Sequence, residues 1–342
     1  MPHQKYLRQR RTNQATPSYE NGVDLIFTFT VFNQLLAAAL IKSWEPYGRS
    51  ALVVNSAPKP FSNDRAEVIN FCANDHSIFT RFVIYHSIAR KLRKLRSQKK
   101  IVSVSAPHPH NLLSNSLILT PGNFSVNIYE DGAGNYCASN VEGRLKEKSK
   151  RKRIIGPLVG YRYLDYSGHI SGLDERLMDN GYFISPENIY RPERFLKLHR
   201  IDLDLPEEDA ISGFENAALI LDQDIEEVLE EQVADKLRAK MYNLANSLGT
   251  TILVKSHPAS SKILEYHGYK AEPIILDAKE AAEILALRYR PRYVVSYFSS
   301  ALKNIKQLLP ETQCIEIGTK ELDDRFDTHL SEVFRIFDIE LA

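Results

Sequence analysis

Short apolar runs alternate along this chain with longer stretches of helical periodicity. In the first half, the apolar runs are rich in β-branched and aromatic residues, which favour strands. The predicted strands there are 23–30, 50–54, 100–105 and 124–129, and the predicted helices are 32–44 and 79–96. Strands that alternate with helices indicate βαβ units and a parallel sheet.

The same alternation resumes after residues 186–215, which carry three prolines and an acidic cluster. The predicted strands beyond them are 217–221, 251–254, 273–276, 293–297 and 313–317, with helices at 224–248, 278–289 and 300–309. This pattern predicts a second α/β domain. We place the boundaries at 1–22 for a polar, basic tail, 23–205 for an N-terminal domain and 206–342 for a C-terminal domain.

Length and charge narrow the function classes. The 342 residues suffice for two domains with sizeable cores. Lys plus Arg is 44 and Asp plus Glu is 43, so no overall field attracts nucleic acid. Three widely spaced cysteines fit a reducing compartment better than a disulfide framework. The longest apolar stretch, 25–44, is interrupted by polar residues and predicts a strand and a buried helix, not a membrane span.

Two segments are unusually basic. Residues 1–22 are polar and basic, typical of a disordered tail and not of a signal peptide. Residues 144–153 form a dense basic run, which we interpret first as a solvated helix or loop. The alternative is a patch that meets anionic lipid headgroups or an anionic acceptor.

An acidic motif follows the predicted strand 124–129. Glu130 and Asp131 stand at its carboxyl end, where ligands bind in open α/β sheets. Gly132 allows a sharp turn and a close approach of the backbone. One carboxylate could take a proton from an attacking hydroxyl, and because neighbouring side chains on an extended chain point to opposite sides, we expect only one to face a cleft. The alternative is an ordinary acidic turn.

A histidine ends a strand in the second half. His257 follows Lys255 and Ser256 after the run 251–254, and Pro258 cannot continue the strand. An imidazole at this position could bind a phosphate and offset the charge of a leaving group. Taken alone, the His-Pro pair would be a surface turn.

A pair of serines follows the strand 293–297. Ser299 and Ser300 stand where that strand meets the next helix. Hydroxyls and backbone N–H groups at a helix N-terminus form an anion site. The simpler interpretation is a plain N-cap, and both can hold because capping leaves one hydroxyl free.

The order and spacing of the three motifs are more specific than any one of them. Glu130-Asp131-Gly132, His257-Pro258 and Ser299-Ser300 match an acid–acid–Gly motif, a His-Pro motif and a downstream Ser-Ser motif. In these motifs the chain resembles the bacterial sialyltransferases of two-domain architecture, which include lipooligosaccharide sialyltransferases and capsular polysialyltransferases. The resemblance spans roughly residues 23–310 and implies two Rossmann-like α/β domains that face a cleft, the GT-B type.

The resemblance also implies a role for each motif. Asp131 would be the general base for the acceptor hydroxyl, with Glu130 as second choice, and His257 would contact the donor phosphate as acid or electrostatic stabiliser. The donor-binding residues that it implies are Gly132, Lys255, Pro258, Ser299, Ser300 and Gln34. Residues 30–34 lack the Thr-Pro-x-Gln form that is common in the family, which leaves a donor contact of Asn33 or Gln34 open.

The histidines at 106–110 suggest a second kind of site. His108 and His110 alternate with prolines, and two histidines could begin a metal site. Acids or cysteines that would complete it are lacking nearby, so a loop that lines the acceptor cleft is the favoured interpretation. We expect no bound metal.

These observations predict an inverting, metal-independent glycosyltransferase that moves sialic acid from CMP-sialic acid to a hydroxyl of a bacterial surface glycan, lipooligosaccharide or capsule. CMP is a monophosphate leaving group, so histidine, hydroxyls and a helix N-terminus can replace a metal, and no cofactor is expected. The expected location is the cytoplasm, with peripheral association with the inner membrane and a homodimer as further interactions. The alternatives are a transferase for Kdo or another CMP-activated nonulosonate, and a non-catalytic glycan-binding or assembly protein with the same fold.

Overall fold

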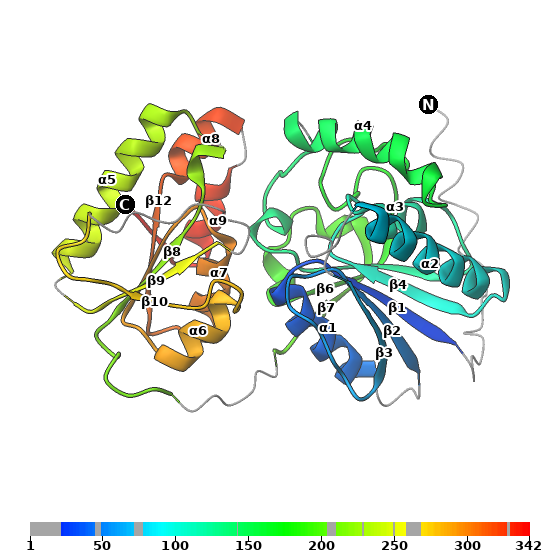
Figure 1. Cartoon of the computed structure of the whole chain (residues 1–342), viewed down its shortest axis with the longest axis horizontal. Coiled ribbons are helices and arrows are strands. Elements are labelled where there is room, and N and C mark those ends of the chain that lie inside the picture. The colour runs from blue at the N-terminus through cyan, green and yellow to red at the C-terminus, as the bar shows by residue number, and fades with distance from the viewer. Residues whose placement is uncertain are drawn as a thin grey trace.

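The computed structural model describes residues 22–44, 49–71, 78–141, 143–203, 210–227, 229–248, 250–257, 268–326 and 329–342. These residues form two α/β domains that lie side by side (Figure 1). Each domain contains one parallel sheet with helices packed against both faces. Among the described helices, none is both long enough and apolar enough to cross a membrane.

The N-terminal domain is built on a seven-stranded sheet in the order β3-β2-β1-β4-β5-β6-β7, with every pair parallel. The strands are β1 Val23–Thr28, β2 Ser50–Asn55, β3 Ala66–Asn70, β4 Ile101–Ala106, β5 Ser125–Tyr129, β6 Met178–Phe183 and β7 Phe195–Arg200. The helices are α1 Val31–Trp44, α2 Ile78–Ser97, α3 Leu112–Leu119 and α4 Gly143–Leu158, with short 3-10 turns η4 Ala133–Asn135, η5 Pro186–Asn188 and η6 Pro192–Arg194.

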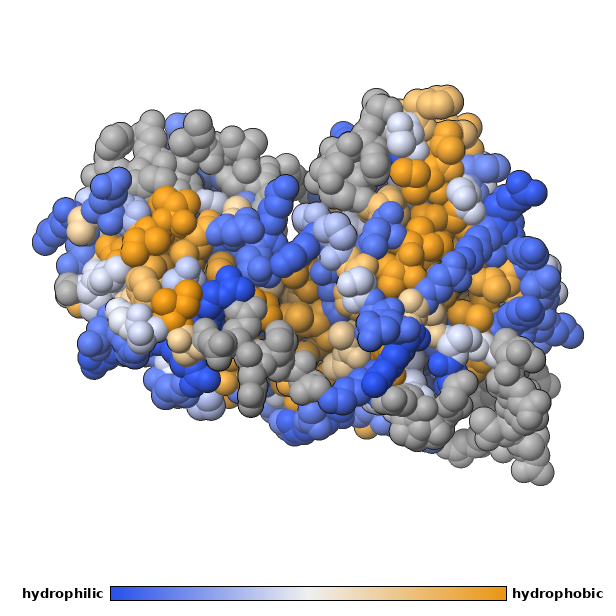
Figure 2. Space-filling view, turned by 60° about the horizontal axis from the view of Figure 1, so that its bottom comes forward, coloured by the Kyte–Doolittle hydropathy of each residue, from blue (hydrophilic) through white to orange (hydrophobic). Residues whose placement is uncertain are grey.

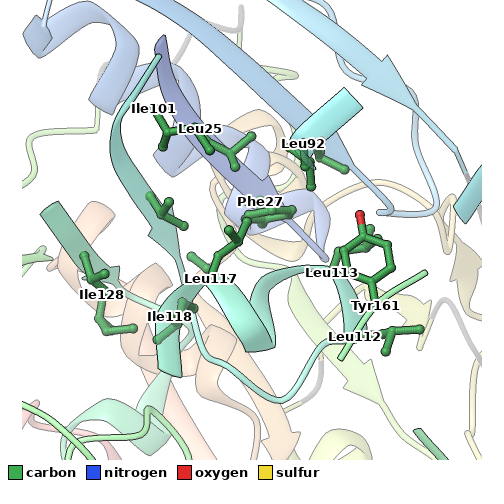
Figure 3. Close-up of a cluster of buried hydrophobic side chains, with 14 of the residues drawn as sticks. Leu25, Phe27, Leu92, Ile101, Leu112, Leu113, Leu117, Ile118, Ile128 and Tyr161 are labelled. Atoms are coloured by element: carbon green, nitrogen blue, oxygen red, sulfur yellow. The ribbon is translucent and has the colours of Figure 1, made fainter. Parts of the chain in front are cut away.

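Strand β1 is buried on both faces, which explains its continuous apolar run. Leu25 and Phe27 point to one face, where they pack with Leu92 of α2 and Leu117 of α3 (Figure 3). Ile26, between them, points to the other face and packs against α1. Because successive side chains of a strand alternate between faces, a central parallel strand covered on both sides has few polar positions.

The C-terminal domain has a six-stranded parallel sheet in the order β10-β9-β8-β11-β12-β13. The strands are β8 Ala218–Asp222, β9 Ile252–Ser256, β10 Ile274–Ile275, β11 Tyr293–Tyr297, β12 Gln313–Ile317 and β13 Glu340–Leu341. The other elements are η7 Ile225–Glu227, α5 Glu231–Ser247, α6 Ala282–Tyr289, α7 Ser300–Leu308, α8 Thr319–Phe326 and α9 Leu330–Ile336. Helix α5 covers one face of the sheet, and α6, α7 and α9 cover the other.

These two sheets confirm the predicted fold class. The structure adds β3, β6, β7 and α3 to the first domain, and α8, α9 and β13 to the second, none of which the apolar pattern had predicted. The predicted helix 224–248 is divided, since η7 precedes α5. The predicted domain boundary at 205–206 lies outside the described residues, and so does nearly all of the tail 1–22.

A buried ion pair joins the two domains. Glu130, directly after β5, pairs with Lys303 of α7, and neither side chain has any exposed surface. The hydroxyl of Tyr136 and the backbone N–H of Ile184 each donate to Glu130 Oε2 at 2.8 Å. The Lys303 ammonium also lies 4.2 Å from the centre of the Tyr136 ring, a cation–π contact.

Apolar packing surrounds this ion pair. Tyr136 lies edge-on to Phe337 of the second domain, with ring centres 5.2 Å apart. Ala133 and Cys137, from the loop after β5, are buried in the same hydrophobic cluster as α7 and α9. Further out, the Lys59 ammonium of the first domain pairs with Glu280 of the second at 2.9 Å. The loop after β5 is therefore part of the core of the opposite domain.

Replacing Lys303 alone should destabilise the protein strongly. Lys303→Met leaves the Glu130 carboxylate buried without its counter-charge, which typically costs about 3–5 kcal/mol. The double variant Glu130→Gln, Lys303→Met removes both charges and keeps an oxygen acceptor for Tyr136, so it should lose less. Denaturant unfolding followed by circular dichroism measures both. A double variant that is less stable than Lys303→Met would contradict this account of the pair.

Candidate active site

The predicted motifs all lie at the carboxyl ends of parallel strands. The acid motif follows β5, His257 follows β9, and Ser299 and Ser300 join β11 to α7. Because all strands of a parallel sheet end at the same edge, each sheet gathers its polar groups along one edge. The two domains bring the acid motif and the serine pair into direct contact.

The two acids of the motif have opposite environments. Glu130 is fully buried in the ion pair with Lys303. Asp131 points the other way, and 29 % of its side chain is exposed. This is the alternation expected for neighbouring residues on an extended chain. Asp131 is the acid of the pair that an acceptor hydroxyl could reach.

Side chains from two neighbouring strand ends hold the Asp131 carboxylate. The amide nitrogen of Asn33, in the first turn of α1, donates to Oδ1 at 3.4 Å. Nε2 of His108, just after β4, lies 3.6 Å from Oδ2. The backbone N–H of Asp131 is fixed by Asn135 Oδ1 at 2.6 Å. The Asp131 carboxylate is thus surrounded by residues that follow the adjacent strands β1, β4 and β5.

The hydrogen bonds of His108 determine which of its nitrogens faces the acid. The backbone N–H of His110 donates to His108 Nδ1 at 3.1 Å, so Nδ1 is the unprotonated acceptor. The proton of the neutral ring then lies on Nε2, which faces Asp131. Burial lowers the pKa of His108, and the Asp131 charge opposes that shift. The sequence predicted that this loop lines the acceptor cleft, but it did not link His108 to Asp131.

Gly132 brings the acid motif against the serine pair. Its φ of +131° is a conformation that side chains rarely adopt. An added Cβ would come within 2.6 Å of Ser300 Oγ and 2.8 Å of Ser300 Cβ. The glycine is therefore needed both for its backbone conformation and for the close approach of the two domains.

The serine pair begins α7. Ser299 is the N-cap, and its Oγ accepts the backbone N–H of Ala301 at 3.3 Å. Ser300 is the first helical residue and carries the hydroxyl that faces Gly132. Lys303, one turn later, is the partner of Glu130. One short helix therefore positions both hydroxyls at its N-terminus, where an anion could bind, and also closes the domain interface.

His257 lies on the same edge of the second sheet. It is exposed and directly follows β9. Strand β8 lies between β9 and β11, so two strand spacings, about 10 Å, separate the ends of β9 and β11. That distance can be spanned by a nucleoside monophosphate. Pro258, its predicted companion, lies outside the described residues.

Lys255 and Gln34 have internal partners. The buried Lys255 ammonium donates to the carbonyls of Ser256 and Ala278, each at 3.1 Å. Burial lowers the pKa of Lys255, and the charge of Glu283 opposes that shift. The Gln34 amide donates to Asn55 Oδ1 at 3.0 Å and to the Lys59 carbonyl at 2.5 Å. In this structure both side chains support loops that follow strand ends.

The other contacts of the histidine loop, residues 106–110, support its structure. The His110 carbonyl accepts a hydrogen bond from Lys152 of α4 at 2.6 Å. Burial lowers the pKa of His110 to about 3, so its ring is neutral. Among the described residues, no group of three or more His, Cys, Asp or Glu side chains is placed to hold a metal.

Gly132→Ala should impair both transfer activity and stability, because the new methyl group would meet Ser300 and the backbone conformation is strained by about 1–3 kcal/mol. Gly134→Ala is the matched control, since a Cβ there would come no closer than 3.5 Å to Ser139. Activity and thermal unfolding of the two variants check this. Equal behaviour of the two would show that the approach of Gly132 to Ser300 is not required.

A family model described as Alpha-2,8-polysialyltransferase matches residues 54–315. Among curated proteins, no match is found. Among solved structures, the chain is similar to an alpha/beta-galactoside alpha-2,3-sialyltransferase from the luminous marine bacterium Photobacterium phosphoreum. The two share 11 % identity, with a TM-score of 0.54, over 94 % of this chain and 98 % of that one.

Two further solved structures have lower TM-scores. The glycotransferase of kitacinnamycin has 9 % identity and a TM-score of 0.46, over 86 % of this chain and 80 % of that one. The wall teichoic acid polymerase TagF has 13 % identity and a TM-score of 0.45, over 91 % of this chain and 74 % of that one. At such identities the sialyltransferase structure shows a shared GT-B fold alone.

Proposed function

The chain belongs to the alpha-2,8-polysialyltransferase family and is a sialic acid glycosyltransferase, and from this premise we propose its donor, acceptor and mechanism. The donor is CMP-sialic acid, and the acceptor is a hydroxyl of a bacterial surface glycan, lipooligosaccharide or capsule. Transfer inverts the anomeric configuration and needs no metal.

One observation carries the proposal: the residue that follows a partly exposed carboxylate lies against a helix N-terminus with two hydroxyls across the domain interface. Asp131 belongs to the first domain, and Ser299 and Ser300 belong to the second. The Gly132 contact with Ser300 keeps these groups close together. A base on one wall and an anion cradle on the other is what transfer from a phosphate leaving group to a hydroxyl requires.

The proposed reaction is a single displacement. Asp131 takes the proton of the acceptor hydroxyl as that oxygen attacks the anomeric carbon of the sugar. The bond from this carbon to the phosphate oxygen breaks on the opposite face, and CMP leaves with the bonding electron pair. His257, Ser299 and Ser300 contact the phosphate and offset the negative charge that develops on it. Attack opposite the leaving group explains the inversion.

The assignment of the base to Asp131 rests on exposure. Glu130 has no exposed surface and shares its carboxylate with Lys303, Tyr136 and Ile184. Asp131 is partly exposed, and Asn33 and His108 contact its two oxygens without covering it. The neutral His108 ring keeps Nε2 3.6 Å from Oδ2, a polar contact longer than a hydrogen bond, and so favours one orientation of the carboxylate.

The cytoplasmic location belongs to the same proposal. Cys137 and Cys314 are buried and unpaired, and burial raises the pKa of each thiol to about 12. Such thiols are inert and fit a reducing compartment. Peripheral membrane association and a homodimer stay predictions at this point.

Asp131→Asn should abolish most transfer while leaving CMP binding intact, because it removes proton acceptance without changing shape. General base catalysis typically contributes about 10²–10⁴-fold to the rate. Asp165→Asn, at an exposed surface pair with Arg153, is the control. Transfer is followed with a labelled acceptor, and CMP binding by calorimetry. Undiminished transfer by Asp131→Asn would remove Asp131 as the base.

Donor screening tests the substrate assignment. The wild-type protein should release CMP from CMP-sialic acid in the presence of a sialylated or galactoside acceptor, and should do so far more slowly from CMP-Kdo. Release from CMP-Kdo alone would replace the sialyl assignment by a Kdo transferase. Release from neither donor across an acceptor panel would favour a non-catalytic glycan-binding protein.

A further inference from the structure

Large apolar side chains reach the surface on two helices of the N-terminal domain. Helix α2 exposes three of them in its first two turns, and α4 exposes three near its end. Their exposed fractions lie between 42 % and 76 %. The six are Phe79, Phe82, Val83, Ile154, Ile155 and Leu158. Figure 2 shows apolar residues at the surface of the N-terminal domain beside hydrophilic ones. A gathering of this kind usually marks an interaction site.

The exposed face of α2 is apolar at one end and basic at the other. Phe79, Phe82 and Val83 lie on one side of the helix, as spacings of three and four residues require. Arg90 and Lys94, seven and eleven residues after Val83, continue that exposed side. The helix therefore presents an apolar half and a positive half to the same environment.

Helix α4 divides into an inner and an outer face. Ser149, Lys152 and Gly156 form the inner face. Ser149 Oγ bonds to the Tyr163 hydroxyl at 3.1 Å, and Lys152 donates to the His110 carbonyl at 2.6 Å. The inner face thus supports the histidine loop of the active site.

The outer face of α4 has the same composition as the exposed face of α2. Lys150 and Arg151 are exposed and lie one turn before Ile154 and Ile155, and Leu158 follows on the same side. The exposed cations Lys150 and Arg151 of the dense basic run therefore belong to the first half of this outer face, while Lys152 of the same run faces inward.

The two helices adjoin. Gly160, two residues after α4, lies so close to α2 that a Cβ there would come within 3.2 Å of the Arg93 guanidinium and 3.7 Å of Ala89 Cβ. The apolar end of α4 therefore meets the basic half of α2. In Figure 1, α4 lies on the outer side of the N-terminal domain, away from its sheet. We call the outer faces of α2 and α4 together the docking face.

We propose that the docking face binds the surface of a bilayer that contains anionic lipids. Apolar side chains flanked by Lys and Arg are the composition of helices that lie in a membrane interface, where the apolar groups enter the acyl boundary and the cations meet the headgroups. The protein as a whole carries a formal net charge of only +1, so this positive charge is local to the face.

The docking face lies on the other side of α4 from the histidine loop, and this position indicates what membrane binding would achieve. This part of the inference rests on the proposed function. A helix is about 10–12 Å across, and the inner side of α4 holds the loop that carries His108 to Asp131. Docking through the outer side would keep the acceptor base within a short distance of the membrane surface. An acceptor glycan anchored in lipid would then meet the base without leaving the bilayer.

Vesicle flotation tests the proposal with the full chain and with neither donor nor acceptor present. The probes are vesicles of phosphatidylcholine alone and of phosphatidylcholine with phosphatidylglycerol. One variant replaces Phe79, Phe82, Ile154 and Leu158 by Ser, and a second replaces Arg90, Lys94, Lys150 and Arg151 by Gln. The control replaces Leu196, Ile275 and Ile336 by Ser, which are equally exposed apolar residues elsewhere.

The wild-type protein and the control should float with the anionic vesicles and not with phosphatidylcholine alone, and raised salt should release them. Both docking-face variants should bind at least about tenfold more weakly, while all four proteins keep wild-type transfer to a short free glycan.

Three results would overturn the proposal. The first is that the wild-type protein fails to bind anionic vesicles at low salt. The second is that the Ser variant binds them as well as the wild-type protein does. The third is that light scattering shows a dimer for the wild-type protein and a monomer for the Ser variant. The last would assign the face to a second copy of the chain. Vesicle binding without transfer to any acceptor would support the docking face and count against the proposed function alone.

Discussion

The buried ion pair between Glu130 and Lys303 is the constraint on which the site depends. It fixes the loop after β5 against α7, and it uses one acid of the motif entirely inside the protein. Because neighbouring residues alternate in direction, burying Glu130 turns Asp131 the other way, where Asn33 and His108 contact it and 29 % of its side chain is exposed. Gly132, the next residue, then meets Ser300. Three consecutive residues thus join the domains, supply the proposed base and set its distance to the proposed phosphate site.

Helix α7 makes the matching contribution from the other side. Ser299, Ser300 and Lys303 lie at its N-cap and within its first turn, so the two hydroxyls and the interface cation move as one body. In the first domain, the ends of β1, β4 and β5 contribute Asn33, His108 and Asp131 side by side. The geometry of the site therefore follows from the order of strands in each sheet and from one short helix.

The sequence predicted the elements whose own composition is typical of a strand or a helix. Strand β11, Tyr293–Tyr297, was predicted to the residue because a central strand buried on both faces is mostly apolar and rich in β-branched and aromatic residues. Strand β6 was missed because Met178–Phe183 contains Asp, Asn and Gly, whose place in a sheet is determined by pairing with β5 and β7. For the candidate site, the sequence predicted that each motif follows the carboxyl end of a strand. Nothing local could reveal that Lys303 neutralises Glu130 or that His108 faces Asp131, because those contacts join distant parts of the chain.

The central claim is that Glu130 holds the domains together and Asp131 does the chemistry. The most direct test is the transfer rate of the double variant Glu130→Gln, Lys303→Met, measured where circular dichroism shows it folded. If Glu130 acts only by holding the loop after β5 against α7, this variant should lose some transfer but stay well above Asp131→Asn, since Asp131 is unchanged. A folded double variant that binds CMP but transfers no faster than Asp131→Asn would contradict the account.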